Sequence, residues 1–172
     1  MNKTRRLVLL ALLVAIAAAL HIVEGWLPVP MPVPGAKLGL ANIVSLLALI
    51  MFGWREALYV AVSRVLLGSL FGGILLGPAF AMSMGGALIS VISMTYIHKK
   101  HRRLFSLVGV SVVGAVAHNV TQVALASIIV YSPGLLWYAP YMLLFAIPTG
   151  LFIGLAVNYF FAKIPAKYGI NW

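Results

Sequence analysis

The chain has 172 residues, of which 63% are hydrophobic and only 8% are charged, and its mean hydropathy is +1.10. A soluble domain of this length needs more polar surface, so the composition predicts an integral membrane protein. The absence of cysteine excludes disulfides, thiol catalysis and cysteine-ligated metal sites. The net charge of +10 could suggest nucleic-acid binding, but the basic residues cluster at the ends of apolar runs, which is typical of membrane topology. We therefore expect membrane lipid, and no nucleic acid, as a partner.

Apolar runs separated by proline and glycine breaks predict an all-α polytopic protein whose single transmembrane domain covers residues 1–172. In chain order, the six predicted transmembrane helices lie near residues 6–27, 38–52, 55–72, 78–97, 104–131 and 137–162. The first run could be a signal peptide, but the chain after it is equally apolar, so a retained helix is the better interpretation.

The distribution of charge predicts that both termini are cytoplasmic. Ten of the twelve basic residues lie in segments that six spans would place inside the cell, namely 1–6, 53–56, 98–103 and the C-terminal tail. The loops expected outside carry no charge at 72–78 and 132–136. Because Lys and Arg accumulate on cytoplasmic loops, we expect a multi-pass protein of the cytoplasmic membrane.

The first predicted helix carries a row of small residues, Ala11, Ala15 and Ala19, at i, i+4 and i+8 spacing. Small residues at this spacing let another helix approach closely. The row could pack inside the protein or dock a partner protein, and the sequence leaves both interpretations open.

The loop at 28–37 alternates prolines, which favour an extended backbone that needs few hydrogen bonds. We expect it to form a lid over a pocket at the outer surface. Lys37 and Asn42 stand at the start of the second predicted helix and one turn further in, where a cation and free N–H groups suit a carboxylate or phosphate. Alternatively, the Lys37 side chain extends to the outer lipid headgroups.

Arg64 lies near the middle of the third predicted helix, where an unpaired charge costs several kcal/mol. Helical geometry predicts that it points into the bundle, on one face with Ala57, Ala61, Gly68 and Phe71. Neither of the two acids, Glu24 and Glu56, is an obvious partner, because they lie near opposite edges of the membrane. We expect Arg64 to bind an anionic or carbonyl-bearing ligand or a partner acid, or to be satisfied by carbonyls at helix ends.

The fifth predicted helix places His118, Asn119 and Gln122 on one face. Three polar side chains in the middle of a membrane indicate either a ligand site or hydrogen bonds between helices. A metal site is not expected, since His21 is the only other histidine within a predicted span.

Catalytic machinery is missing from the sequence. The chain has no aspartate, so it lacks the acidic clusters that bind Mg²⁺ for diphosphate chemistry. It also lacks a glycine-rich ATPase loop and an acid–base dyad. We therefore expect a binding protein that is not an enzyme and uses no cofactor.

Three motifs, "PGAKLGLANIVSLLALIMFGWREAL", "SRVLLGSLFGG" and "GAVAHNVTQVALA", resemble the family called heptaprenyl diphosphate synthase component I, or Gx transporters. This family in turn resembles the substrate-binding S components of energy-coupling factor (ECF) transporters. The resemblance implies six helices, a lid between the first two, and an alanine-rich face on the first helix that docks on a transmembrane coupling protein. Residues 28–37 match that lid, and Ala11, Ala15 and Ala19 match that face.

The resemblance implies a subunit that binds a small, anionic or vitamin-like molecule for an ATP-driven importer. Its partners would be a coupling protein and ATPase subunits. On the residues, Lys37 and Arg64 would neutralise the anion, and the polar edge would be fixed by Asn42, His118, Asn119 and Gln122. The alternative is a non-catalytic membrane accessory of polyprenyl diphosphate or quinone biosynthesis, or of a flavin-linked redox system.

Overall fold

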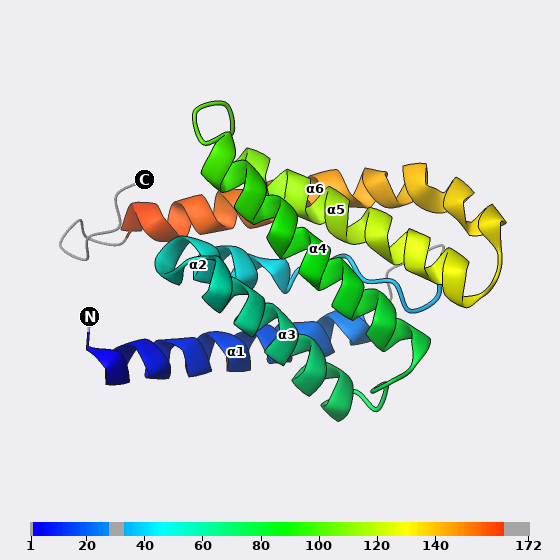
Figure 1. The fold of residues 1–172 in the computed structure, drawn as a ribbon, viewed down its shortest axis with the longest axis horizontal. Helices are drawn as coiled ribbons and strands as arrows, with labels where there is room; N and C mark the ends of the chain where they lie inside the picture. Colours follow the sequence, from blue (N-terminus) through cyan, green and yellow to red (C-terminus); the bar gives the residue numbers. More distant parts are fainter. Residues whose placement is uncertain (1, 28–32, 164–172) are drawn as a thin grey trace.

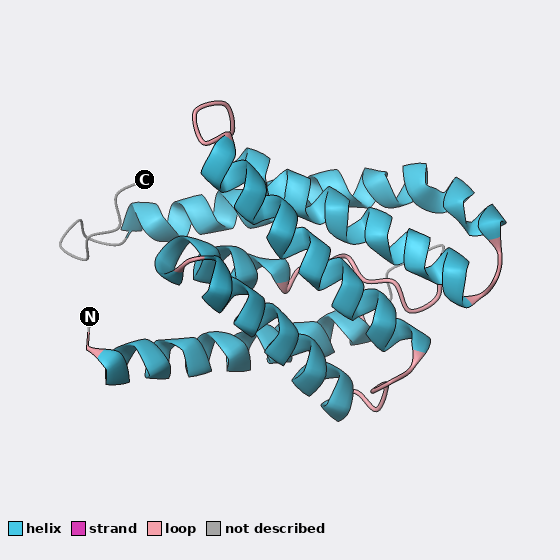
Figure 2. Ribbon diagram, viewed as in Figure 1, coloured by secondary structure: helices cyan, strands magenta, loops and turns pink. Residues whose placement is uncertain are grey.

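The computed structural model describes residues 2–27 and 33–163, which form helices and no strand (Figures 1 and 2). The α-helices are α1 Lys3–Trp26, α2 Asn42–Phe52, α3 Trp54–Phe71, α4 Pro78–Lys100, α5 Leu107–Ile129 and α6 Ala139–Lys163. A 3-10 helix, η1, Pro133–Tyr138, leads into α6. The all-α prediction is confirmed for this part of the chain.

Four segments are long and apolar enough to cross a membrane: α1, α4, α5 and Pro133–Lys163. α2 has 11 residues, so it rises only about 16 Å, whereas the hydrocarbon core is about 30 Å thick. α3 has 18 residues but includes the charges of Arg55, Glu56 and Arg64. The chain is therefore a membrane-embedded helical protein, and the six-span count and the cytoplasmic termini stay predictions.

The helices place most of the basic residues at one end of the bundle. α1 begins and α6 ends at this end, beside the α2–α3 junction at Gly53 and the α4–α5 connection at 101–106 (Figure 1). We call it the basic end. The opposite end holds the end of α1, the α3–α4 connection at 72–77 and η1, and we call it the connection end.

The short α2 is the central element of the bundle. It contacts all five other α-helices, and it begins near the middle of the bundle and runs to the basic end (Figure 1). Its predicted start at 38 is four residues too early, because residues 38–41 are not helical and Gly39 has φ +84°. Non-helical backbone at membrane depth is tolerated when protein surrounds it, and Gly39 and Ala41 are indeed buried.

The lid predicted at 28–37 is described in its second half only, because residues 28–32 lie outside the described residues. Val33 is 2% exposed and packs with Met82, Val123 and Met142, so it anchors the connection among α4, α5 and α6. The backbone turns at Gly35, whose φ is +80°.

Two glycines let α6 pack directly on the backbone of α5. A Cβ atom on Gly150 would lie 2.6 Å from the Cα of Val112, and one on Gly154 would lie 2.5 Å from the Cα of Val108. Small residues four positions apart are typical of closely packed membrane helices. The spacing of the two glycines is therefore a signal of this contact in the sequence itself.

Replacement of Gly150 by alanine is expected to separate α5 from α6. Because the added Cβ would meet backbone atoms that cannot rotate aside, the overpacking cost lies in the upper part of its range, about 2–3 kcal/mol. The better helix propensity of alanine returns about 1 kcal/mol, so we expect a net loss of about 1–2 kcal/mol. Thermal unfolding in detergent, followed by circular dichroism, measures it. Gly134→Ala is the control, because its Cβ would meet only the Ser132 Oγ at 3.8 Å. An unchanged midpoint in Gly150→Ala would contradict the close approach.

Candidate functional site

Buried polar side chains from four helices meet around the start of α2. Each is at most 5% exposed. They are His21 and Glu24 on α1, Asn42 on α2, Arg64 on α3, and His118 and Gln122 on α5. We call this set the polar cluster. The structure thus brings together four of the predicted site residues, Asn42, Arg64, His118 and Gln122, and adds the two from α1, which were not predicted as site residues.

Glu24 occupies the position where an anion was expected. Its carboxylate accepts the backbone N–H groups of Gly39 and Leu40, the latter at 3.3 Å, just before α2 begins. It also interacts electrostatically with Arg64 and Lys37. Glu24, which the sequence did not indicate as an obvious partner of Arg64, therefore interacts with it, because the last turn of α1 lies beside the start of α2.

A pattern in α1 could have identified Glu24. His21 and Glu24 are three residues apart and follow Ala17 on the buried face of the helix. A carboxylate on the same helix face as small and polar residues indicates that it is buried and pairs with a polar or charged group inside the bundle.

Arg64 points into the bundle, as predicted, and it is 1% exposed. Its Nη2 donates to the Asn42 Oδ1 at 2.7 Å. The small residues predicted on its face are buried as well, namely Ala57, Ala61 and Gly68. Phe71 departs from the prediction, since it is 74% exposed in the last turn of α3, at the connection end.

Lys37 lies in the connection before α2 and not in the first turn of a helix. Its backbone N–H donates to the Gln122 Oε1 at 3.0 Å, and its Nζ donates to the backbone carbonyl of His21 at 3.0 Å. The side chain therefore turns toward α1 and not out to headgroups. Burial lowers the pKa of the Lys37 amine to about 8, with Glu24 acting to raise it and Arg64 to lower it.

The three polar residues of α5 share a buried face, as predicted, but they contact different neighbours. The Gln122 Nε2 lies 2.8 Å from the His118 Nε2, which places both in the polar cluster. Asn119 instead donates to the carbonyl of Met142 on α6 at 3.0 Å. Of the two alternatives left open, a hydrogen bond between helices therefore describes Asn119.

A cavity of about 280 Å³ adjoins the polar cluster at the connection end. The end of α1, the connection before α2, the end of α3 and the start of α4 form its walls. Glu24 and Lys37 line it and join it to the cluster. Of the six predicted substrate-binding residues, Lys37 alone lines this cavity.

Five polar atoms of the cluster have no hydrogen-bond partner among the residues that the structure describes: His21 Nε2, Glu24 Oε2, Asn42 Nδ2, Arg64 Nε and His118 Nδ1. Buried polar groups in native proteins are nearly always hydrogen-bonded, to protein, ordered water or a ligand. The cluster therefore has donors and acceptors that a polar molecule could use.

The predicted docking residues Ala11, Ala15 and Ala19 are all exposed on α1, whose opposite face packs on α3 and α2. A groove of about 850 Å³ runs between α1 and α3 past Ala11 and Ala15. An ion pair between Arg6 and Glu56 joins the same two helices near the basic end. The alanine row is thus available on the surface, and its role in docking stays a prediction.

Within the described part of the chain, no group of three or more His, Cys, Asp or Glu side chains could hold a metal ion.

The aromatic residues near the helix ends face outward, as Trp26 is 77% and Trp137 86% exposed. They lie where aromatic side chains commonly meet lipid headgroups.

Residues 13–160 match the family described as heptaprenyl diphosphate synthase component I. The chain belongs to this family. The match spans all six α-helices, from within α1 to near the end of α6, and it includes every predicted substrate-binding residue. No curated protein and no solved structure matches the chain. The resemblance to S components therefore stays a prediction.

Proposed function

We propose that the chain is the membrane-embedded, substrate-binding subunit of an ATP-driven uptake transporter of the ECF type. The observation that carries the proposal is the cavity at the connection end, which adjoins a cluster of buried polar groups inside an apolar helical bundle. Ionisable residues inside a membrane are costly, and they commonly mark a substrate pathway.

The charges around the cavity favour a small molecule with one acidic group. Lys37 and Arg64 supply two positive charges, and Glu24 supplies one negative charge. The Lys37 ammonium uses one donor on the carbonyl of His21, so two donors are left for a ligand in the cavity that it lines. A volume of about 280 Å³ lies at the lower end of ligand pockets, which suits a vitamin-sized or smaller molecule.

In this proposal the connection before α2 is the moving part of the site. It carries Lys37 and Gly39, forms one wall of the cavity, and is held to the helices by side-chain bonds from Glu24 and Gln122. A ligand would enter from outside when this segment lifts. The exposed alanine row of α1 would dock on a coupling protein. That protein would couple ATP hydrolysis by the ATPase subunits to transport.

Exchange of Lys37 for glutamine tests the site, because it removes the cation that faces the cavity. We expect fewer small molecules to be retained by the purified protein, as measured by mass spectrometry of its extract. Lys163→Gln is the matched control at the basic end. A compound that binds wild type should also bind more weakly as the pH rises through about 8, where Lys37 loses its proton. Equal retention by Lys37→Gln and wild type would refute the assignment.

The family description favours a second candidate, a non-catalytic membrane accessory of polyprenyl diphosphate or quinone synthesis. In a variant of this candidate, the chain is a non-catalytic membrane accessory of a flavin-linked redox system. Affinity purification from the native membrane separates the candidates. A coupling protein with ATPase subunits would support the transporter, and a soluble prenyl synthase would support the accessory role.

A further inference from the structure

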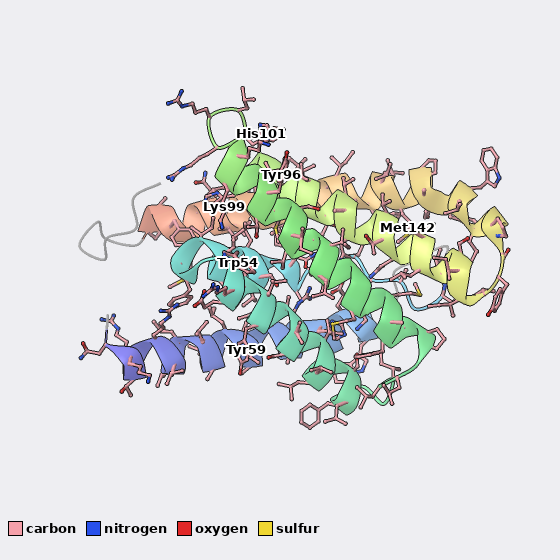
Figure 3. All side chains as sticks on the ribbon, in the orientation of Figure 1. Trp54, Tyr59, Tyr96, Lys99, His101 and Met142 are labelled. Carbon is pink, nitrogen blue, oxygen red and sulfur yellow. The ribbon has the colours of Figure 1, made fainter. Side chains whose placement is uncertain are left out.

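An apolar groove of about 500 Å³ lies between α3 and α4 at the basic end. Leu58 on α3 and Val91 and Ile92 on α4 form its walls, and Trp54, Lys99 and Lys100 stand at its mouth. Figure 3 shows Trp54, Tyr96 and Lys99 gathered at this end of the bundle. The groove is far from the cavity described above, which lies at the connection end.

Aromatic rings, and not carboxylates, hold the cations at the mouth of the groove. The Lys99 Nζ lies 5.6 Å from the centre of the Trp54 ring, and the Arg55 Cζ lies 5.5 Å from it. The Lys100 Nζ lies 5.5 Å from the centre of the Tyr96 ring. A cation over an aromatic ring keeps N–H donors for other acceptors. In the described residues, the one ion pair is the bond between Arg6 and Glu56, so neither lysine has a carboxylate partner.

We propose that this groove is a specific binding site for an acidic phospholipid. An acyl chain would lie along Leu58, Val91 and Ile92, and the phosphate would accept hydrogen bonds from Lys99 and Lys100. Basic pockets between membrane helices bind acidic headgroups, and each nearby Lys or Arg adds to the attraction. The bias of positive charge toward cytoplasmic loops explains why lysines occur at this end. It does not explain why two of them border an apolar groove.

The neighbouring arginines provide a matched control. Arg102 and Arg103 follow closely after Lys100, in the α4–α5 connection, and are exposed, but they do not line the groove. The double variants Lys99→Gln/Lys100→Gln and Arg102→Gln/Arg103→Gln therefore remove equal charge from the same region. All four positions are exposed, so both variants are expected to fold.

Quenching of Trp54 by brominated lipid tests the proposal. The other tryptophans are first replaced (Trp26→Phe, Trp137→Phe and Trp172→Phe), and the protein is placed in phosphatidylcholine vesicles that contain brominated phosphatidylglycerol. We expect half-maximal quenching at a much lower fraction of brominated phosphatidylglycerol than of brominated phosphatidylcholine. The Lys99→Gln/Lys100→Gln variant should weaken this preference about tenfold or more, and the arginine variant less than threefold.

Three results would overturn the proposal. Equal quenching by the two brominated lipids would show an ordinary lipid annulus. If both double variants lose the preference for phosphatidylglycerol to the same extent, the basic end attracts acidic lipid generally and not at the groove. Quenching by neither lipid would show that lipid does not enter the groove, as when a second protein covers it.

Discussion

Replacement of Arg64 by leucine is expected to lower the free energy of unfolding by about 3–5 kcal/mol, because it leaves a buried carboxylate without its compensating positive charge. Arg64 is 1% exposed, and its loss leaves the Glu24 carboxylate inside the bundle without its buried cation. The Asn42 Oδ1 also loses its donor. Thermal unfolding in detergent should show a midpoint lowered by roughly 10 °C.

The charge of Glu24 explains most of this loss, and a double variant isolates it. Arg64→Leu/Glu24→Gln removes both charges, so it should be more stable than Arg64→Leu alone by about 2 kcal/mol. Arg102→Leu, at an exposed position, is the control and should unfold like wild type. If the double variant loses as much unfolding free energy as the two single variants lose together, the two charges do not stabilise each other.

Gly39→Ala is the second change with a large expected effect. The residue has φ +84°, a conformation that costs an L-residue about 1–2 kcal/mol. Its Cβ would lie 2.8 Å from the Asn42 Nδ2 and 3.0 Å from the His118 Cδ2, and such overpacking costs about 1–3 kcal/mol more. We expect a total loss of about 2–5 kcal/mol in unfolding free energy, together with weaker retention of any ligand bound at the polar cluster.

Gly73→Ala separates the two causes. Gly73 has φ +68°, but a Cβ there would meet nothing within 4 Å. It should therefore lose only the backbone component, about 1–2 kcal/mol. Equal midpoints for the two variants, measured by the same thermal unfolding, would mean that Asn42 and His118 move aside at no cost.

Helical periodicity explains why many features of the fold could be predicted. The predicted helices agree with the structure to within a few residues at most ends, since long apolar runs and proline or glycine breaks are local signals. The same periodicity placed Arg64, His118, Asn119 and Gln122 on buried faces. The family was also identified correctly from three motifs.

Features that depend on contacts between distant segments were missed. Glu24 and Arg64 are 40 positions apart in the sequence, so no local pattern showed that the acid lies beside the start of α2. The late start of α2 has a similar origin. Residues 38–41 are apolar enough for a helix, but Glu24 binds the N–H groups of Gly39 and Leu40, and Gly39 adopts a left-handed backbone.

The short α2 also bears on how the chain is inserted during synthesis. A helix of 11 residues cannot partition into lipid as an independent unit. The polar backbone before it is bonded by Glu24 on α1, made earlier, and by Gln122 on α5, made three helices later. The segment 33–52 therefore cannot reach its final depth until the ribosome has delivered α5. Its insertion is a late step of assembly, governed by the other helices and not by its own hydropathy.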